Sequence, residues 1–396
     1  MTDTARLIAK FKLSFGVTGI RNAFGSALWF GLTLLIGLIR VMGNLPERLL
    51  CATIEFWTDL MAATTWQGRL LGCGLLLGLA TLPNWAGASL LPMMISVLWF
   101  AYVGQAWNIL AGFVGQFSLG HALFVGVGAY LAGGTMVYVG GGPGFGLGLG
   151  LGLVVAAALG AAIGALGFRK GMGVNHFALL TVVAVELARL CFTQFDGLRL
   201  GIGRALPPSR LLILTPTHFY YIILALTVLL LLFCRILVRS RLGRAWLALR
   251  EAPIAAAATG INVFRAKLAA VMISAAFCAV AGAFQAISVQ IQAAPALDPG
   301  RVFSFTGSVE IALGVIVGGT GTLVGPLLGA LVLTPFGEGL NLLAARTGHG
   351  MLELKPLCYG LILVLVEFLR PAGLWPWLGQ RLRLVPGGDL AEGGRR

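Results

Sequence analysis

Residues 217–238 read THFYYIILALTVLLLLFCRILV, and this stretch decides the fold class. A helix needs about 20 apolar residues to cross the hydrocarbon core of a bilayer. The stretch has that length, and its one charged residue, Arg235, lies near its end. It therefore predicts a membrane-spanning helix.

The composition of the whole chain also indicates a lipid environment. Of its 396 residues, 58% are hydrophobic and 11% are charged, and the mean hydropathy is +0.93. Ordinary soluble domains carry roughly 25% charged residues, and a soluble protein of this composition would expose large apolar patches. We therefore predict an all-α fold, a polytopic transmembrane helical bundle in a lipid membrane.

Six further segments satisfy the same length rule. They are 88–111, 117–139, 145–168, 177–195, 264–288 and 354–370. Two other apolar segments, 26–43 and 68–82, lie in a region that we treat as an N-terminal extension, residues 1–85. No cleavable signal peptide is apparent at the start of the chain, because the first 25 residues are polar and basic.

The net charge of +14 is explained by topology, because the cations lie mostly between apolar segments. They are not interleaved with aromatic residues on one face, so we expect no nucleic-acid partner. The loop 239–263 and its flanks carry seven cations against Glu251 alone, which predicts that this loop is cytoplasmic. The cations are Arg235, Arg239, Arg241, Arg244, Arg250, Arg265 and Lys267.

The C-terminal tail, residues 376–396, is also basic and should be cytoplasmic. A continuous span over the apolar segment 308–336 would place it on the other side. The number of membrane crossings therefore predicts a broken or re-entrant late hairpin, and the residues that break it are Gly318, Gly319 and Gly321. Irregular backbone of this kind must be shielded by protein or line a cavity. Residues 86–375 then form the transmembrane domain.

Three polar side chains interrupt the glycine-rich run 112–130, namely Gln116, Ser118 and His121. Buried polar groups in lipid need partners, so they either form hydrogen bonds between helices or line a substrate path. A fourth path candidate is Glu186, which lies three residues before Arg189 on one helix. That spacing places both on the same face, where a local ion pair is the simpler interpretation.

The cytoplasmic segment 240–268 contains an alanine-rich stretch that favours a helix over 243–260, ending at Gly260 and Asn262. About 25 residues with their own helix are long for a simple connection between two spans. The segment therefore predicts a docking element for a cytoplasmic partner.

Enzyme signatures are absent from the sequence. It has no phosphate-binding loop of the G-x-x-x-x-G-K-[ST] type, no HExxH and no GxSxG. The four histidines lack metal-ligand spacing and the six cysteines form no CxxC pair. We expect no catalytic residue, no metal and no cofactor in this chain, so any ATP would bind to another subunit.

Four stretches resemble the permease family of ABC importers for branched-chain amino acids, in particular the longer of its two permease types. They are GFVGQFSLGHALFVGVGAYLAG (112–133), FALLTVVAVELARL (177–190), GRAWLALREAPIAAAATGINVFRAKLAAVMISAAFCAVAGA (243–283) and VIVGGTGTLVGPLLGALVL (315–333). In this order they resemble the family's early glycine-rich helix pair, its middle helix, its coupling-loop region and its late hairpin. The likeness covers roughly residues 95–375.

The resemblance implies a multi-pass permease of the bacterial inner (plasma) membrane that works by alternating access and leaves its substrate unaltered. Its implied partners are a second permease subunit, two cytoplasmic ATP-binding subunits and a periplasmic substrate-binding protein. The helix in 243–260 would transmit closure of the ATP-binding subunits to the spans. The implied coupling residues are Arg244, Arg250, Glu251 and Gly260.

Three alternatives stay open at this point. The stretch FDGLRLGIGRALPPS (195–209) departs from the family's usual loop, and the family includes importers of urea and short-chain amides. An ion-coupled secondary carrier would predict paired carboxylates within the membrane and transport by this chain alone. A membrane-bound enzyme would predict a cluster of catalytic residues at one membrane face.

Overall fold

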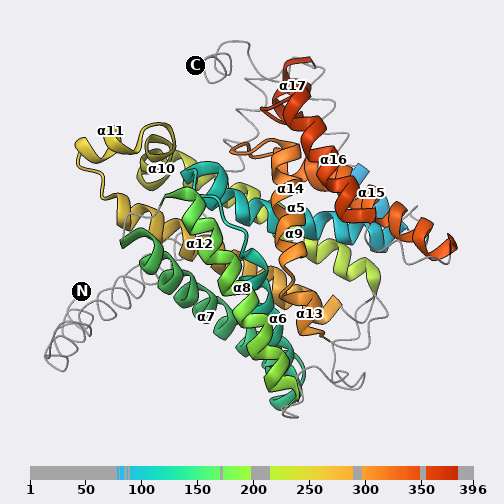
Figure 1. The fold of residues 1–396 in the computed structure, drawn as a ribbon. Helices are drawn as coiled ribbons and strands as arrows, with labels where there is room; N and C mark the ends of the chain where they lie inside the picture. Colours follow the sequence, from blue (N-terminus) through green and yellow to red (C-terminus); the bar gives the residue numbers. More distant parts are fainter. Residues whose placement is uncertain are drawn as a thin grey trace, which may run out of the picture. The chain divides into compact units, whose positions relative to one another are not determined.

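The computed structural model describes residues 78–79, 81–83, 87, 90–169, 173–197, 215–288, 297–347 and 354–381. Throughout these ranges the regular elements are helices, with no strand among them (Figure 1). The predicted segment 26–43, most of 68–82 and of the extension 1–85, and the tail beyond Arg381 lie outside the described residues. The prediction of an all-α helical bundle is confirmed.

Seven helical segments of the described chain are long and apolar enough to cross a membrane. Six are single helices: α5 (Leu90–Val114), α6 (His121–Tyr138), α7 (Gly141–Arg169), α8 (Val174–Gly197), α9 (Pro216–Arg239) and α12 (Val263–Ser288). The seventh runs from Pro299 to Gly318 and contains α13 (Pro299–Val302) and α14 (Phe305–Gly318). The predicted span 354–370 is helix α16 (Leu354–Leu369), whose 16 residues are short for a full crossing.

Two differences from the sequence-based boundaries have local causes. The span expected from residue 117 begins as a helix only at His121, because Gly115 takes a positive φ of 73° and residues 115–120 are not helical. The single helix expected over 243–260 is two helices, α10 (Arg241–Glu251) and α11 (Pro253–Ala258). Proline disfavours the helical conformation for the residue before it, and Ala252 accordingly has φ −148° and ψ 86°.

The late hairpin is broken between α14 and α15 (Gly325–Thr347). Within the break, Gly319 and Gly321 have φ values of 119° and 77°, in the left-handed region that favours glycine. Helix α15 continues beyond the predicted end at residue 336, through Pro335 to Thr347. A last short helix, α17 (Leu374–Arg381), crosses the expected domain boundary at residue 375.

The tightest part of the fold is the packing of α6, α7 and α12 against one another. Small residues make this possible, since helices in lipid associate through close packing rather than through the hydrophobic effect. A Cβ atom on Gly282 of α12 would collide with the carbonyl oxygen of Val125 on α6. In the reverse direction, a Cβ on Gly128 would collide with the carbonyl oxygen of Ala279. The backbones of α6 and α12 are therefore in direct contact.

Helix α5 forms the centre of a second group of helices. It packs against α15, α9, α12 and α14, and 17 of its 25 residues are buried. Helix α16 joins this group through an apolar cluster with α14 and α15, in which Tyr359 and Val366 meet Leu313, Val317 and Leu333.

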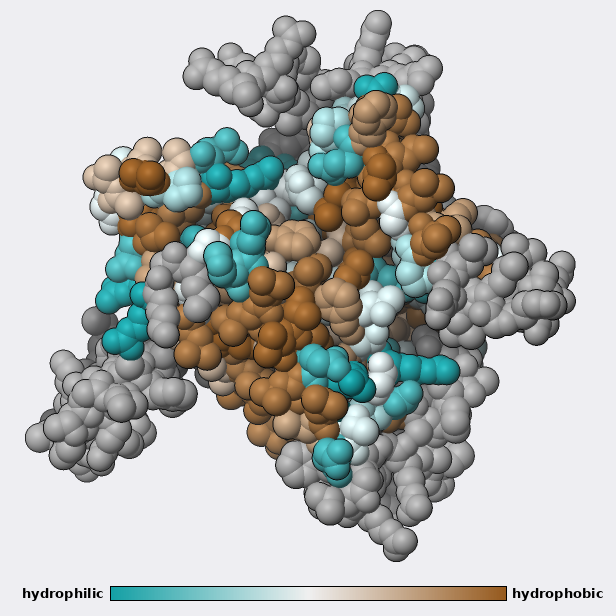
Figure 2. Space-filling view, in the orientation of Figure 1, coloured by the Kyte–Doolittle hydropathy of each residue, from teal (hydrophilic) through white to brown (hydrophobic). Residues whose placement is uncertain are grey.

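The outer faces of several helices are apolar, as expected for surfaces that meet lipid or another membrane subunit. On α16, Leu361, Val364 and Phe368 are 65%, 66% and 86% exposed. Helices α7 and α8 also carry exposed leucines and valines. Figure 2 shows the corresponding broad apolar surface, which small hydrophilic patches interrupt.

Replacing Gly282 with alanine tests the packing of α6 on α12. Alanine is the better helix former, but its methyl group would overlap the α6 backbone. We expect Gly282→Ala to destabilise the protein by about 1–3 kcal/mol and to lower its thermal unfolding midpoint in detergent. The matched control is Gly150→Ala on α7, where an added Cβ meets nothing within 4 Å. Equal midpoints for the two variants would contradict this packing.

Candidate functional site

A junction of three elements lies where α10 ends. Arg250, in the last turn of α10, donates a hydrogen bond from Nη1 to the carbonyl oxygen of Gly112 near the end of α5, at 2.6 Å. A Cβ on Gly321, in the hairpin break, would collide with the same guanidinium group. Arg250 therefore touches α5 and the hairpin break at once, and it ties α10 to both.

The break is held from the other side by Asn108, a fully buried residue of α5. Its Nδ2 donates to the carbonyl oxygen of Thr322 at 2.8 Å, and its Oδ1 accepts from the backbone N–H of Gly321 at 2.8 Å. One side-chain amide thus replaces two hydrogen bonds that the interrupted helix cannot make. In a membrane protein such freed backbone groups need internal partners.

Glycine is required at both contact points of the junction. A Cβ on Gly112 would collide with the Asn108 side chain and would lie 2.7 Å from the backbone nitrogen of Gly321. Gly321 combines a positive φ with direct contact to Arg250. The turn before α17 also closes on the break, because a Cβ on Gly373 would overlap the backbone of Gly319. The α5 end, the break and this turn are thus packed backbone against backbone.

Ser118 lies in the non-helical segment before α6 and His121 is the first residue of α6, and they are 1% and 0% exposed. The Ser274 hydroxyl of α12 donates to the carbonyl oxygen of Ala106 at 2.7 Å, so its oxygen accepts from His121 Nε2 at 2.8 Å. His121 Nδ1 then accepts from the Ser118 hydroxyl at 3.1 Å. This chain of hydrogen bonds joins α5, α6 and α12.

The non-helical segment before α6 is fixed by further hydrogen bonds. Trp107 Nε1 donates to the carbonyl oxygen of Ser118 at 2.7 Å, and Thr181 Oγ1 of α8 accepts from the N–H of Leu119 at 3.0 Å. Gln116 is 1% exposed, and its side-chain Nε2 has no hydrogen-bond partner in the described part of the chain. Ser118 and His121 thus form hydrogen bonds between helices, and a role of these residues in a substrate path stays a prediction.

Glu186 and Arg189 form the expected ion pair on one face of α8. Arg189 Nε donates to both carboxylate oxygens of Glu186 at 3.0 Å, and Nη2 donates to one of them. The two side chains are partly exposed. Glu186 is therefore open to the surface of the described chain, whereas Gln116, Ser118 and His121 are buried.

The remaining predicted coupling residues lie on the exposed side of α10 and α11. Arg244 donates from Nη1 to the carbonyl oxygen of Arg239 at 2.7 Å, Glu251 ends α10 in an exposed position, and Gly260 follows α11 with a φ of 86°. Trp246 holds α10 in place, since its buried Nε1 donates to the carbonyl oxygen of Ala266 at 2.8 Å. All four coupling candidates are exposed, and Arg250 in addition contacts α5 and the hairpin break.

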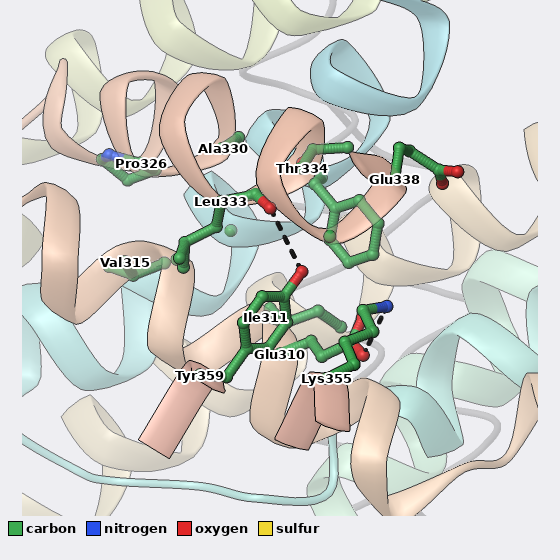
Figure 3. Close-up of a pocket in the computed structure, with 14 residues that line it drawn as sticks. Glu310, Ile311, Val315, Pro326, Ala330, Leu333, Thr334, Glu338, Lys355 and Tyr359 are labelled. Atoms are coloured by element: carbon green, nitrogen blue, oxygen red, sulfur yellow. Dashed lines mark hydrogen bonds and ion pairs between the residues drawn. The ribbon is translucent and has the colours of Figure 1, made fainter. Parts of the chain in front are cut away.

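A second charged pair ties α14 to α16 beside a pocket of about 440 Å³ that includes its open mouth. Lys355 Nζ lies 2.8 Å from Glu310 Oε1, and the Tyr359 hydroxyl donates to the carbonyl oxygen of Leu333 at 3.1 Å (Figure 3). Glu338 lines the same pocket. Lys355 is the second residue of α16, so this pair lies at the end of its helix.

Sequence reasoning missed Asn108, Ser274 and Thr181. Each is a polar residue inside an apolar span, which is the same signal that identified Ser118 and His121. Among the described residues, no group of three or more His, Cys, Asp or Glu side chains could hold a metal ion.

Comparison with known proteins agrees with this architecture. A family model described as the permease component of branched-chain amino acid transport systems matches residues 89–367. The LivM permease protein of the high-affinity branched-chain amino acid transport system of Escherichia coli K12 is 29% identical over 336 residues, with 75% of this chain and 73% of that protein covered.

The LivM protein of Salmonella typhimurium LT2 is 28% identical over 329 residues, with 74% of this chain and 71% of that protein covered. No solved structure matches the chain significantly. The family match includes the junction, the α8 ion pair and the broken hairpin. Together with seven helical segments able to cross a membrane, it shows that the chain is a multi-pass membrane protein of the family of branched-chain amino acid transport system permease components.

Proposed function

We propose that this chain is the permease subunit of an ATP-driven importer that moves branched-chain amino acids across the bacterial inner membrane. Its partners in this proposal are a second permease subunit, two cytoplasmic ATP-binding subunits and a periplasmic binding protein. The chain itself needs no cofactor, because ATP binds to the partners. The family match and the two LivM relatives support the substrate class.

The observation that carries the mechanism is the contact of Arg250 with α5 and with the hairpin break. Helices α10 and α11 connect the membrane helices α9 and α12. A displacement of α10 therefore acts on the end of α5 through the Arg250 hydrogen bond. Through Asn108, the same displacement acts on the backbone of the hairpin break.

The surface that would meet an ATP-binding subunit is the tip formed by α11. Ile254 is 88% exposed there, and the neighbouring Ala255, Ala257 and Ala258 are exposed too. An apolar tip next to the basic helix α10 can insert into a groove of the ATP-binding subunit. Closure of the two ATP-binding subunits then moves α11, α10 and the junction, and alternates the side to which the path opens.

An importer of urea or short-chain amides would use the same coupling machinery, whereas a secondary carrier would not need it. The family match and the relatives favour the amino acid substrate over amides. Transport by this chain alone, driven by an ion gradient, would support the carrier.

Purification of the tagged chain from detergent-solubilised membranes tests the proposed assembly. We expect a second permease and two phosphate-loop ATP-binding subunits to copurify. In proteoliposomes, the complex with its binding protein should take up leucine only when ATP is present on the side of the ATP-binding subunits. Uptake by this chain alone, without ATP, would contradict the importer.

Replacing Arg250 tests the coupling junction. Arg250→Ala removes a charged hydrogen bond, of a kind that contributes about 1.5–3 kcal/mol. We expect the assembled importer to keep hydrolysing ATP while leucine uptake per ATP falls by about tenfold or more.

The matched control for this prediction is Arg241→Ala, which removes an exposed charge from the first turn of the same helix. It should keep uptake within twofold of the unmodified protein. Equal uptake per ATP for Arg250→Ala and Arg241→Ala would show that the junction does not transmit the motion.

A further inference from the structure

The ion pair of Glu186 and Arg189 lies near the middle of α8. At 1.5 Å per residue, Glu186 is about 18 Å from the first residue of the helix and about 16 Å from its last. The hydrocarbon core of a bilayer is about 30 Å thick. If α8 crosses the membrane, as its length and hydropathy allow, the pair lies near the bilayer midplane.

The pair belongs to the outer face of α8, and its surroundings there are apolar. The side chains of Arg189 and Glu186 are 34% and 45% exposed. On the same side of the helix, Val183, Leu187 and Leu190 are 63%, 61% and 49% exposed. We call these five residues, Val183, Glu186, Leu187, Arg189 and Leu190, the α8 face.

Charges at this depth are costly in lipid, and in membrane proteins they mark water-filled paths or contacts with other subunits. Ionisable groups within membrane spans almost always face a protein interior or a water-filled cavity. This pair instead remains open to the outside of the described chain. The α8 face therefore meets something other than lipid.

We propose that the α8 face lines the translocation path and that Glu186 and Arg189 bind the charged head group of an amino acid. This inference rests on the proposed function and deepens it. The substrate ammonium group pairs with the Glu186 carboxylate, and the substrate carboxylate pairs with the Arg189 guanidinium. Leu187 and Val183 then contact the aliphatic side chain of the substrate.

The geometry of the pair leaves hydrogen-bonding positions for the substrate. Arg189 uses Nε and Nη2 toward Glu186, and no partner among the described residues occupies Nη1. A guanidinium has five N–H donors, and a carboxylate accepts at about four positions. A zwitterion can therefore add to the pair without first separating it. Each substrate charge meets an opposite charge, which offsets part of the cost of removing both from water.

The same chemistry sets selectivity. Urea and short-chain amides carry no ammonium and no carboxylate, so they gain neither ionic contact on the α8 face. Arg189 and Glu186 would favour a zwitterion over these neutral solutes of similar size. The face thus discriminates between the two substrate classes that the family resemblance leaves open.

Single neutral substitutions in the complete importer test this inference. In proteoliposomes that contain the whole complex and its binding protein, Glu186→Gln and Arg189→Gln should each lower leucine uptake by about tenfold. Assembly and ATP hydrolysis should stay within twofold of the unmodified complex. The control is Leu361→Ala, which shortens an exposed side chain on the outer face of α16 and should keep uptake within twofold.

A reversed pair separates recognition from folding. The double variant Glu186→Arg/Arg189→Glu keeps an ion pair at the same spacing, so the protein should assemble normally. Its charges meet the substrate in the opposite order, and leucine uptake should still fall by about tenfold. Suppose that the unmodified complex transports leucine. Full uptake by this variant and by both single variants would then overturn the role of the α8 face but not the proposed function. Lack of leucine uptake by the unmodified complex would instead overturn the proposed function.

Thiol labelling locates the face independently of transport. In a cysteine-free background, which removes the exposed Cys191 of α8, Leu187→Cys should react with a small charged thiol reagent and be protected by leucine. Leu361→Cys on the apolar face of α16 should react at least tenfold more slowly. A Leu187→Cys that reacts as slowly as Leu361→Cys, with and without ATP, would place the α8 face against lipid or a partner helix and contradict the inference.

Discussion

Backbone that leaves the helix inside a membrane protein must find new hydrogen-bond partners, and the hairpin break at residues 319–324 finds them in Asn108. The two bonds of this side chain, to Thr322 and Gly321, fix the break against the inner side of α5. Arg250 of α10 contacts the same backbone and bonds to the end of α5. This small set of contacts links α10, the hairpin break and the end of α5 to one another.

Glycine makes these contacts possible, and it does so in two ways. At Gly112 and Gly282, the absence of a side chain lets two helices or a helix and a loop touch at backbone distance. At Gly319 and Gly321, glycine also supplies the positive φ that turns the chain between α14 and α15. Glycine thus serves both close packing and the turn of the hairpin break. In the α6, α7 and α12 group, Gly128 and Gly282 serve close packing, while Gly141 at the start of α7 has a positive φ of 50°.

Hydropathy along the sequence located the long helices because the length of an apolar run is a local property. The ends of α9 and α12 lie within one residue of the predicted spans 217–238 and 264–288. The glycines of the break were identified for the same reason. The junction could not be predicted, because Arg250 and Gly112 are 138 residues apart and Asn108 and Gly321 are 213 apart. A local sequence pattern does not identify which polar residue of one span contacts the broken segment of another. Pro253 is a local signal for the division of the coupling segment into two helices. The alanines after Pro253 favour a helix, and for that reason the sequence analysis predicted one continuous helix.

In the proposed mechanism, α10, α11 and the hairpin break move together when ATP binds to the partner subunits. Spin labels at Ile254 and Thr320, both exposed, measure the distance between α11 and the break, and a label at Leu147 on α7 provides a reference. In the complete importer, the distance between Ile254 and Thr320 should be the same without nucleotide and with ATP trapped, while the distance between Thr320 and Leu147 changes. A change in the first distance with no change in the second would contradict the account, because the coupling helices would then move without the hairpin.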